Sequence, residues 1–229
     1  MQQNPIFASR SASAESALST NKVLRSTYMM LSMTMLVSAV SAGLSMWAGL
    51  GHGAGLMMSI AAIALLWFVL PRTANSEKGI FVVFGFTALM GAALGPTLNH
   101  YLGMANGGMI VMQALAGTAL VFFTLSGYAL TTRKDFSFMG GFLMTGLVVI
   151  LMVMLALFVG SFFGLHIPGA QLALSAGIVL LMSGFILYDT SRIIHGGETN
   201  YLLATVALYL DIYNLFVSLL HLLGAMSDD

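Results

Sequence analysis

The side chains best placed for chemistry are acids that lie inside long apolar runs of this 229-residue chain. Asp211 is the clearest, since it comes ten residues after Tyr201, where the last apolar run begins. At 1.5 Å per residue it lies about 15 Å into a helix, near a bilayer midplane, where an acid facing lipid costs several kcal/mol. We therefore expect Asp211 to face the interior of a helical bundle.

Three further polar side chains follow Asp211 at helical spacing: Asn214, Ser218 and His221. Steps of three, four and three residues put all of them on one face of a helix. This polar stripe runs from the midplane towards the outer end of the helix. It fits a path for protons or ions, and it also fits ordinary hydrogen bonding between membrane helices.

A second acid, Asp189, ends the preceding apolar run in the sequence Tyr-Asp-Thr-Ser-Arg. The last two runs are joined by a short loop, so their helices should pack antiparallel, and Asp189 and Asp211 can lie at the same height. Two carboxyl groups in a low-dielectric bundle resist ionising together, so the pair should share one proton and titrate as a unit. This predicts a proton-sensing and ion-gating pair. The simpler alternative is an interfacial ion pair between Asp189 and Arg192 or another base in the loops.

The same two acids are a candidate calcium site, although Ca²⁺ usually takes six to eight oxygen ligands and two carboxylates supply fewer. We expect no firm metal site and no cofactor, because the chain has no cysteine and its histidines form no cluster by spacing. Arg72, directly after Pro71, is a latch candidate. It would pair with Asp189 when that acid is ionised and release it on protonation. A plain topology-setting base at the membrane surface is the alternative for Arg72.

The composition of the chain indicates the kind of structure that must position these residues. Apolar residues make up 59% of the chain and charged residues 7%, against roughly 25% charged in a soluble domain. A soluble chain of this length would need a far more polar surface, so the apolar surface must face lipid. Eight basic and eight acidic residues cancel, which leaves no net charge to attract nucleic acid.

Seven apolar runs of at least 17 residues are long enough to cross a bilayer as helices. None alternates in the manner of a barrel strand. The sequence therefore predicts an all-α membrane protein, a seven-transmembrane-helix bundle over residues 23–229. The expected helices are 28–50, 54–70, 80–102, 109–130, 139–163, 172–194 and 201–223.

Residues 1–22 are polar and rich in serine, and we expect them to form a disordered tail. All eight basic residues fall in this tail or in loops on the same side of the predicted bundle: Arg10, Lys22, Arg25, Arg72, Lys78, Arg133, Lys134 and Arg192. The positive-inside rule then predicts a cytoplasmic N-terminus and, after seven spans, a C-terminus outside.

Two features bear on packing and on catalysis. Gly91 and Gly95 form a small-xxx-small step, which we assign to close packing inside the monomer rather than to a dimer interface. Paired aspartates on consecutive membrane helices are also what an intramembrane aspartyl protease needs. Those proteases resemble Gly-x-Gly-Asp at the second acid, whereas this chain has Tyr-Leu-Asp at 209–211. We therefore expect the protein not to be an enzyme.

Several longer strings resemble the Bax inhibitor-1 family over nearly all of residues 20–224. They are Leu94-Gly-Pro, Thr131-Thr-Arg-Lys-Asp-Phe-Ser, Tyr188-Asp-Thr and Leu210-Asp-Ile-Tyr-Asn-Leu-Phe. Three more look like the proteobacterial YccA branch of that family: Leu18-Ser-Thr-Asn-Lys-Val-Leu-Arg, Gly117-Thr-Ala-Leu-Val-Phe-Phe and Ile194-His-Gly-Gly-Glu-Thr-Asn-Tyr.

The resemblance implies a multi-pass protein of the bacterial inner membrane, with a periplasmic C-terminus. It implies association with the membrane-anchored AAA+ protease FtsH, which would be slowed in degrading other membrane proteins, and it makes the cytoplasmic tail the part that the protease engages. Channel-like members imply a pH-sensitive calcium leak with a diaspartate sensor, whose positions Asp189 and Asp211 match. Arg72 is a looser match to that family's latch.

Overall fold

The computed structural model describes the backbone of residues 5–164 and 167–227, with side chains described from Thr20 onward. This part of the chain is helical, with no strand, and seven of its helices are long and apolar enough to cross a membrane. The spans are Thr20–Trp47, His52–Thr73, Lys78–Leu102, Gly107–Thr132, Ser137–Phe162, Ala170–Ile194 and Tyr201–Ser227. The predicted seven-helix architecture is confirmed, and most boundaries differ from the expected ones by a few residues.

The first span belongs to α1, which runs from Pro5 to Trp47 without a break. Its apolar part, described from Thr20 to Trp47, contains the predicted first span 28–50 up to Trp47. The predicted disordered tail falls almost wholly on residues 1–19, whose side chains lie outside the described part of the structure.

The second span is built from three short elements in line. They are α2 (His52–Ala64), a π-helical turn η1 (Leu65–Val69) and α3 (Leu70–Thr73). The π turn directly precedes Pro71, which has no amide hydrogen to donate to the preceding turn. The wider turn accommodates the hydrogen bond that Pro71 cannot make.

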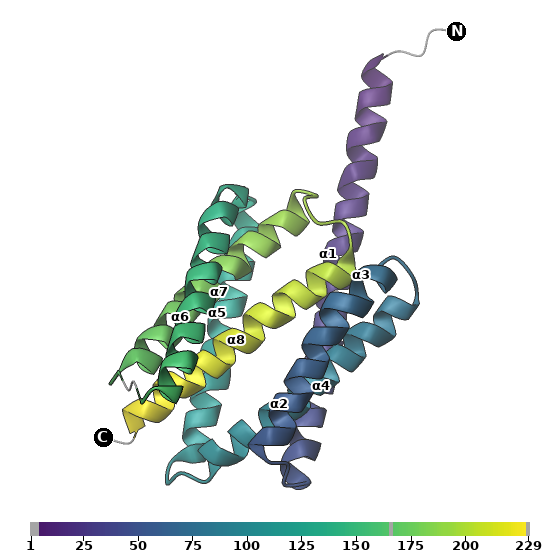
Figure 1. Cartoon of the computed structure of the whole chain (residues 1–229). Coiled ribbons are helices and arrows are strands. Elements are labelled where there is room, and N and C mark those ends of the chain that lie inside the picture. The colour runs from purple at the N-terminus through teal and green to yellow at the C-terminus, as the bar shows by residue number, and fades with distance from the viewer. Residues whose placement is uncertain (1–4, 165–166, 228–229) are drawn as a thin grey trace.

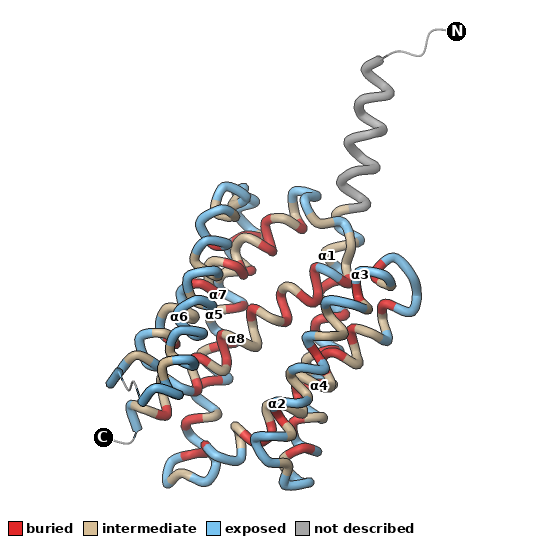
Figure 2. The backbone as a smooth tube through the Cα atoms, in the orientation of Figure 1, coloured by how far each residue is buried: buried red, intermediate tan, exposed pale blue. Residues whose placement is uncertain are grey.

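The remaining spans are α4 (Lys78–Leu102), α5 (Gly107–Thr132), α6 (Gly140–Phe162, after the short η2 turn Ser137–Met139), α7 (Ala170–Ile194) and α8 (Tyr201–Ser227). α8 packs against α1, α4, α5 and α7, and it passes between the two groups of helices in Figure 1. Buried residues are accordingly densest along α8 in Figure 2. α6 lies at the edge, against α7, and exposes most of its side chains.

α1 and α4 form the most extensive helix pair, and glycine allows their close approach. A Cβ at Gly91 would overlap the backbone of Ser38, and one at Gly95 would overlap the Ser45 side chain. The Ser45 hydroxyl donates to the carbonyl of Ala92 at 2.7 Å across this contact. The Gly91–Gly95 step therefore packs inside the monomer, as predicted.

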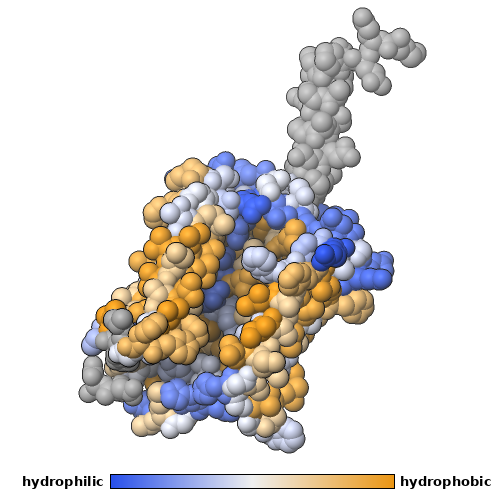
Figure 3. Space-filling model, in the orientation of Figure 1, coloured by the Kyte–Doolittle hydropathy of each residue, from blue (hydrophilic) through white to orange (hydrophobic). Residues whose placement is uncertain are grey.

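Apolar side chains cover the flanks of the bundle, and polar ones gather towards its ends (Figure 3). Large side chains such as Leu120, Phe142 and Leu180 are more than two-thirds exposed on those flanks. A soluble domain does not expose this much apolar surface, whereas a bilayer solvates it. The fold thus places α7 and α8, with their two acids, inside an apolar belt of membrane thickness.

Candidate functional site

Asp189 on α7 and Asp211 on α8 meet across the interface of these two helices. Both residues are buried, with 9% and 5% of their surface exposed. Their carboxyl groups lie within hydrogen-bonding reach of each other. A hydrogen bond between two carboxyl groups requires that one be protonated, because an ionised carboxylate has no hydrogen to donate. The geometry therefore suits two acids that hold one proton between them.

The two acids differ in their access to a counter-charge. Oδ1 of Asp189 lies 3.8 Å from Nη1 of Arg192, one turn further along α7. Arg192 also lies 3.5 Å from Glu198 and stacks over the ring of Tyr188 at 5.6 Å. The arginine is shared between two acids and is about a third exposed. Asp189 thus pairs with Arg192 and also meets Asp211, while the proton-sensing role of the two acids stays a prediction.

Asp211 is the more isolated acid. Its Oδ2 is fully buried and has no hydrogen-bond partner, the one such side-chain atom among the described residues. A buried carboxyl oxygen without a partner loses the solvation that it has in water, and this penalty is greatest for the charged form. Ionisation of Asp211 would therefore place a poorly solvated charge in the core of the bundle.

The latch hypothesis for Arg72 is not supported by the geometry. Its exposed side chain donates from Nη1 to the carbonyl of Phe68, on its own helix. α3 packs against α4 and η1, and within the described chain it does not contact α7 or α8. The base beside Asp189 is Arg192 instead. The Arg72 side chain is exposed and bonds within its own helix, which its position in the sequence does not reveal.

The three polar residues of the predicted stripe are not joined to the acid pair. Nδ2 of Asn214 donates to the carbonyl of Leu210 at 2.8 Å, within α8. Ser218 is buried, and the ring of the exposed His221 lies 6.1 Å from that of Tyr101. The stripe has the expected helical register, but Asn214 bonds within α8 and His221 contacts Tyr101 of α4.

A network of hydroxyl groups lies beside the acid pair and was not predicted from the sequence. The Tyr28 and Ser126 hydroxyls share a short hydrogen bond, and Oγ1 of Thr190 donates to Oγ of Ser126 at 3.3 Å. These residues come from α1, α5 and α7, and Thr190 is next to Asp189. The network ties three helices together at the height of the carboxyl pair. No spacing rule reveals it, because its members lie far apart in the sequence.

The loop between α7 and α8 is a glycine-rich turn. Gly196 has a φ of 74°, which glycine adopts without steric cost. Oδ1 of Asn200 accepts from the backbone N–H of Leu202 at 2.9 Å and so caps α8. The same Asn200 donates through Nδ2 to the carbonyl of Ala74 at 2.9 Å. This turn fixes α7 and α8 in the register that brings their acids together.

The described residues contain no group of three or more His, Cys, Asp or Glu side chains that could hold a metal ion. The acid pair alone offers four carboxyl oxygens, of which one faces Arg192. Full calcium coordination would require further backbone, side-chain or water oxygens.

These features define a class, a polytopic seven-helix membrane protein with a buried carboxyl pair in its core. The sequence profile of the family described as "Inhibitor of apoptosis-promoting Bax1" matches residues 20–228. The chain belongs to this family.

Curated relatives match almost the whole chain. The Escherichia coli K12 protein named "Modulator of FtsH protease YccA" is 50% identical over 223 residues, which cover 97% of this chain and 99% of the relative. An uncharacterized membrane protein of Vibrio cholerae is 48% identical over 226 residues and 98% of each chain. An E. coli O6:H1 relative with 50% identity is named "Inner membrane protein YccA". This chain is a multi-pass membrane protein of the same kind.

Proposed function

We propose that this protein resides in the bacterial inner membrane, binds the FtsH protease and slows its degradation of other membrane proteins. The observation that carries the proposal is the 50% identity, over 97% of the chain, to a protein named as a modulator of that protease. Conservation of length supports it further, because the alignment leaves no room for an additional domain in the relative. The protein acts here by binding and not by catalysis.

The topology supports a protease-facing side. Every basic residue with described side chains lies at the end of the bundle where α1 begins and α7 ends: Lys22, Arg25, Arg72, Lys78, Arg133, Lys134 and Arg192. By the positive-inside rule this end faces the cytoplasm, and the C-terminus then lies in the periplasm. In this topology the N-terminal segment that precedes the first span lies on the cytoplasmic side, where a AAA+ protease with a cytoplasmic motor can engage it.

Deletion of residues 2–19 tests this proposal without touching a membrane span. The matched control keeps the same length and composition but shuffles the order of residues 2–19. We expect the parent to co-purify with FtsH and to lengthen the half-life of an FtsH membrane substrate, and the deletion to lose both effects. Equal co-purification and equal half-lives for parent and deletion variant would contradict the role of the tail.

A second activity is favoured by one observation, the contact between the carboxyl groups of Asp189 and Asp211. We propose that protonation of this pair gates a cation leak, with calcium as the candidate ion. The charged groups that face the pair are Arg192 and, beyond it, Glu198. Loss of the shared proton would place two like charges in contact and push α7 and α8 apart. Protease binding and this leak use separate parts of the molecule.

A further inference from the structure

An elongated cavity lies between α1 and α5, with α8 as its floor and α4 at one end. Its volume is about 580 Å³, within the range of small-molecule sites. The backbones of α1 and α5 do not pack together in the described chain. Tyr28 alone reaches across at one end, through its bond to Ser126 and its ring contact with Phe122 at 6.2 Å. The rim residues Leu115 and Phe123 are more than half exposed, so the cavity opens sideways into lipid.

The cavity is long and narrow. Its lining on α1 extends from Tyr28 to Met46, which corresponds to about 27 Å along the helix and matches the hydrocarbon thickness of a bilayer. A volume of about 580 Å³ spread over this length makes the cavity narrow, which suits a thin, chain-like molecule.

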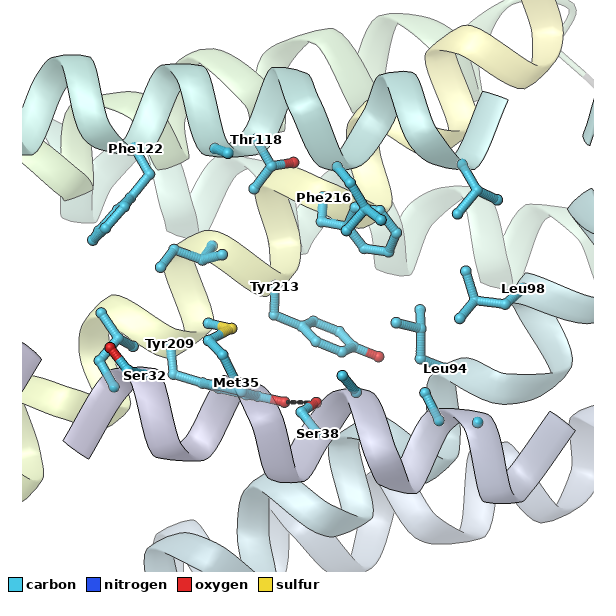
Figure 4. A pocket seen from close by; sticks show the side chains of 18 of the residues that line it. Ser32, Met35, Ser38, Leu94, Leu98, Thr118, Phe122, Tyr209, Tyr213 and Phe216 are labelled. Carbon is cyan, nitrogen blue, oxygen red and sulfur yellow. Dashed lines mark hydrogen bonds between the residues drawn. The ribbon is translucent and has the colours of Figure 1, made fainter. Parts of the chain in front are cut away.

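The lining contains no charged residue, so nothing in it would hold a phosphate or an ammonium headgroup. Its polar atoms are hydroxyl groups, and most of these are already used. Tyr28 bonds Ser126, Ser32 donates to the carbonyl of Tyr28, and Thr118 donates to that of Ala114. The hydroxyls of Ser38 and Tyr209 bond each other at 2.7 Å (Figure 4).

Tyr213 is the exception. Its side chain points into the middle of the cavity in Figure 4, and its hydroxyl has no hydrogen-bond partner among the described residues. Tyr213 lies twelve residues into α8, about 18 Å along it and close to the midplane, where bulk water is absent. The hydroxyl is open to the cavity and not enclosed by protein, and in hydrocarbon a donor without an acceptor costs about 1–3 kcal/mol. The protein does not supply this acceptor.

We propose that the cavity binds a neutral lipid, an elongated apolar molecule with one carbonyl oxygen that accepts a hydrogen bond from Tyr213. Length, width, lack of charge and the single open donor each select this chemistry. A phospholipid fits less well because its charged headgroup stays at the membrane surface, far from Tyr213. This binding site is separate from the acid pair and independent of the proposed action on FtsH.

A photoreactive carbonyl lipid tests the proposal directly. The probe is 4-dodecylbenzophenone, whose carbonyl is both the acceptor and the group that attaches covalently to nearby C–H bonds on illumination. The protein is placed in phosphatidylcholine nanodiscs, and attachment sites are mapped by peptide mass spectrometry. Met35 and Met46 line the cavity, whereas Met33 on the same helix is 45% exposed outside it. We expect adducts on Met35 and Met46 in clear excess over Met33.

Two variants test separately the contribution of the Tyr213 hydroxyl and that of the open volume of the cavity. Tyr213→Phe removes only the donor and should lower adduct yield at Met35 about fivefold, the affinity equivalent of one hydrogen bond. Gly43→Leu fills the cavity, since a Cβ at Gly43 meets no atom within 4 Å, and should abolish adducts there. Tyr128→Phe, on α5 and outside the cavity, is the matched control and should change nothing. Unfolding temperatures confirm that each variant is folded.

Two results would overturn the proposal. Adducts that follow lipid exposure, with Met33 labelled as strongly as Met35 in every variant, would mean that the cavity takes up no probe. Adducts at Met35 that are lost in Gly43→Leu but unchanged in Tyr213→Phe would mean that the cavity holds ordinary lipid chains without recognition of a carbonyl.

Discussion

Asp189 and Asp211 share one buried contact, and among the described residues a cation lies beside Asp189 but not beside Asp211. Arg192 lies 3.8 Å from Asp189, while Oδ2 of Asp211 has no hydrogen-bond partner in the described part of the chain. The two acids therefore differ in how well a negative charge on each would be compensated.

The first prediction concerns ion flux. Purified protein in liposomes should show a calcium leak that changes between about pH 5 and pH 8, since the shared proton controls the charge of the pair. Asp189→Asn and Asp211→Asn each remove one titrating group at constant volume, so both should abolish the pH response. Asp135→Asn, in the exposed α5–α6 loop, is the matched control. No flux above empty liposomes at any pH would make the pair structural and leave FtsH as the sole target.

The second prediction compares the two arginines. Arg192→Gln removes contacts to Asp189 and Glu198 and a hydrogen bond to the carbonyl of Gly197 at 3.3 Å. Amide hydrogen exchange across the α7–α8 turn should rise by up to about fivefold, as expected for partly exposed ion pairs. Arg72→Gln should leave exchange in that turn unchanged. Equal effects of both substitutions would show that Arg72 couples to the pair after all.

The third prediction concerns helix packing. Gly91→Ala places a methyl group against the backbone of Ser38 and should destabilise the bundle by about 1–3 kcal/mol. Gly85→Ala, on the same helix, meets only a side-chain methyl of Leu65 at 3.7 Å and should be neutral or slightly stabilising. Thermal unfolding in detergent measures both. If Gly91→Ala unfolds no earlier than Gly85→Ala, α1 and α4 do not approach closely in the membrane.

The fourth prediction concerns the α5–α6 loop. The Ser137 hydroxyl and then its backbone N–H, which donates to Oδ1 of Asp135 at 2.8 Å, hold the pKa of Asp135 below its ordinary value. Ionised Asp135 therefore stabilises the loop above the unfolded-state pKa, and this stabilisation is lost as pH falls through the folded-state pKa.

Ser137→Ala removes the hydroxyl but keeps the N–H, so the pKa of Asp135 should rise part of the way towards its ordinary value. Carbon NMR titration of the Asp135 carboxyl measures this pKa. Thr131→Ala, near the end of α5 that precedes the loop, is the control. An unchanged titration in Ser137→Ala would assign the lowered pKa to the backbone alone.

The sequence was sufficient to predict the membrane spans and the proximity of the two acids. Apolar runs of membrane length leave the chain no alternative to helices, and a short loop makes α7 and α8 antiparallel neighbours, which brings Asp189 and Asp211 to one height. The partner of Asp189 on its own helix was also accessible, because Arg192 is three residues away.

The arrangement of non-neighbouring helices could not be predicted in the same way. In lipid nearly every face of a helix is apolar, so periodicity does not reveal which face meets which partner. The bond from Tyr28 to Ser126 spans 98 positions, and the gap between α1 and α5 depends on how α8 separates them. The bond from Arg72 to the carbonyl of Phe68 on its own helix likewise has no signal in the sequence pattern.

Reconstitution of purified FtsH in proteoliposomes, with and without this protein, tests the central claim most directly. The measurement is the initial rate at which FtsH degrades a membrane substrate, with a soluble FtsH substrate measured in parallel to report on the intact protease. We predict that the protein lowers the rate for the membrane substrate in proportion to its amount, and that the variant lacking residues 2–19 does so far less. Identical degradation rates with and without the protein, at several-fold excess over FtsH, would contradict the account.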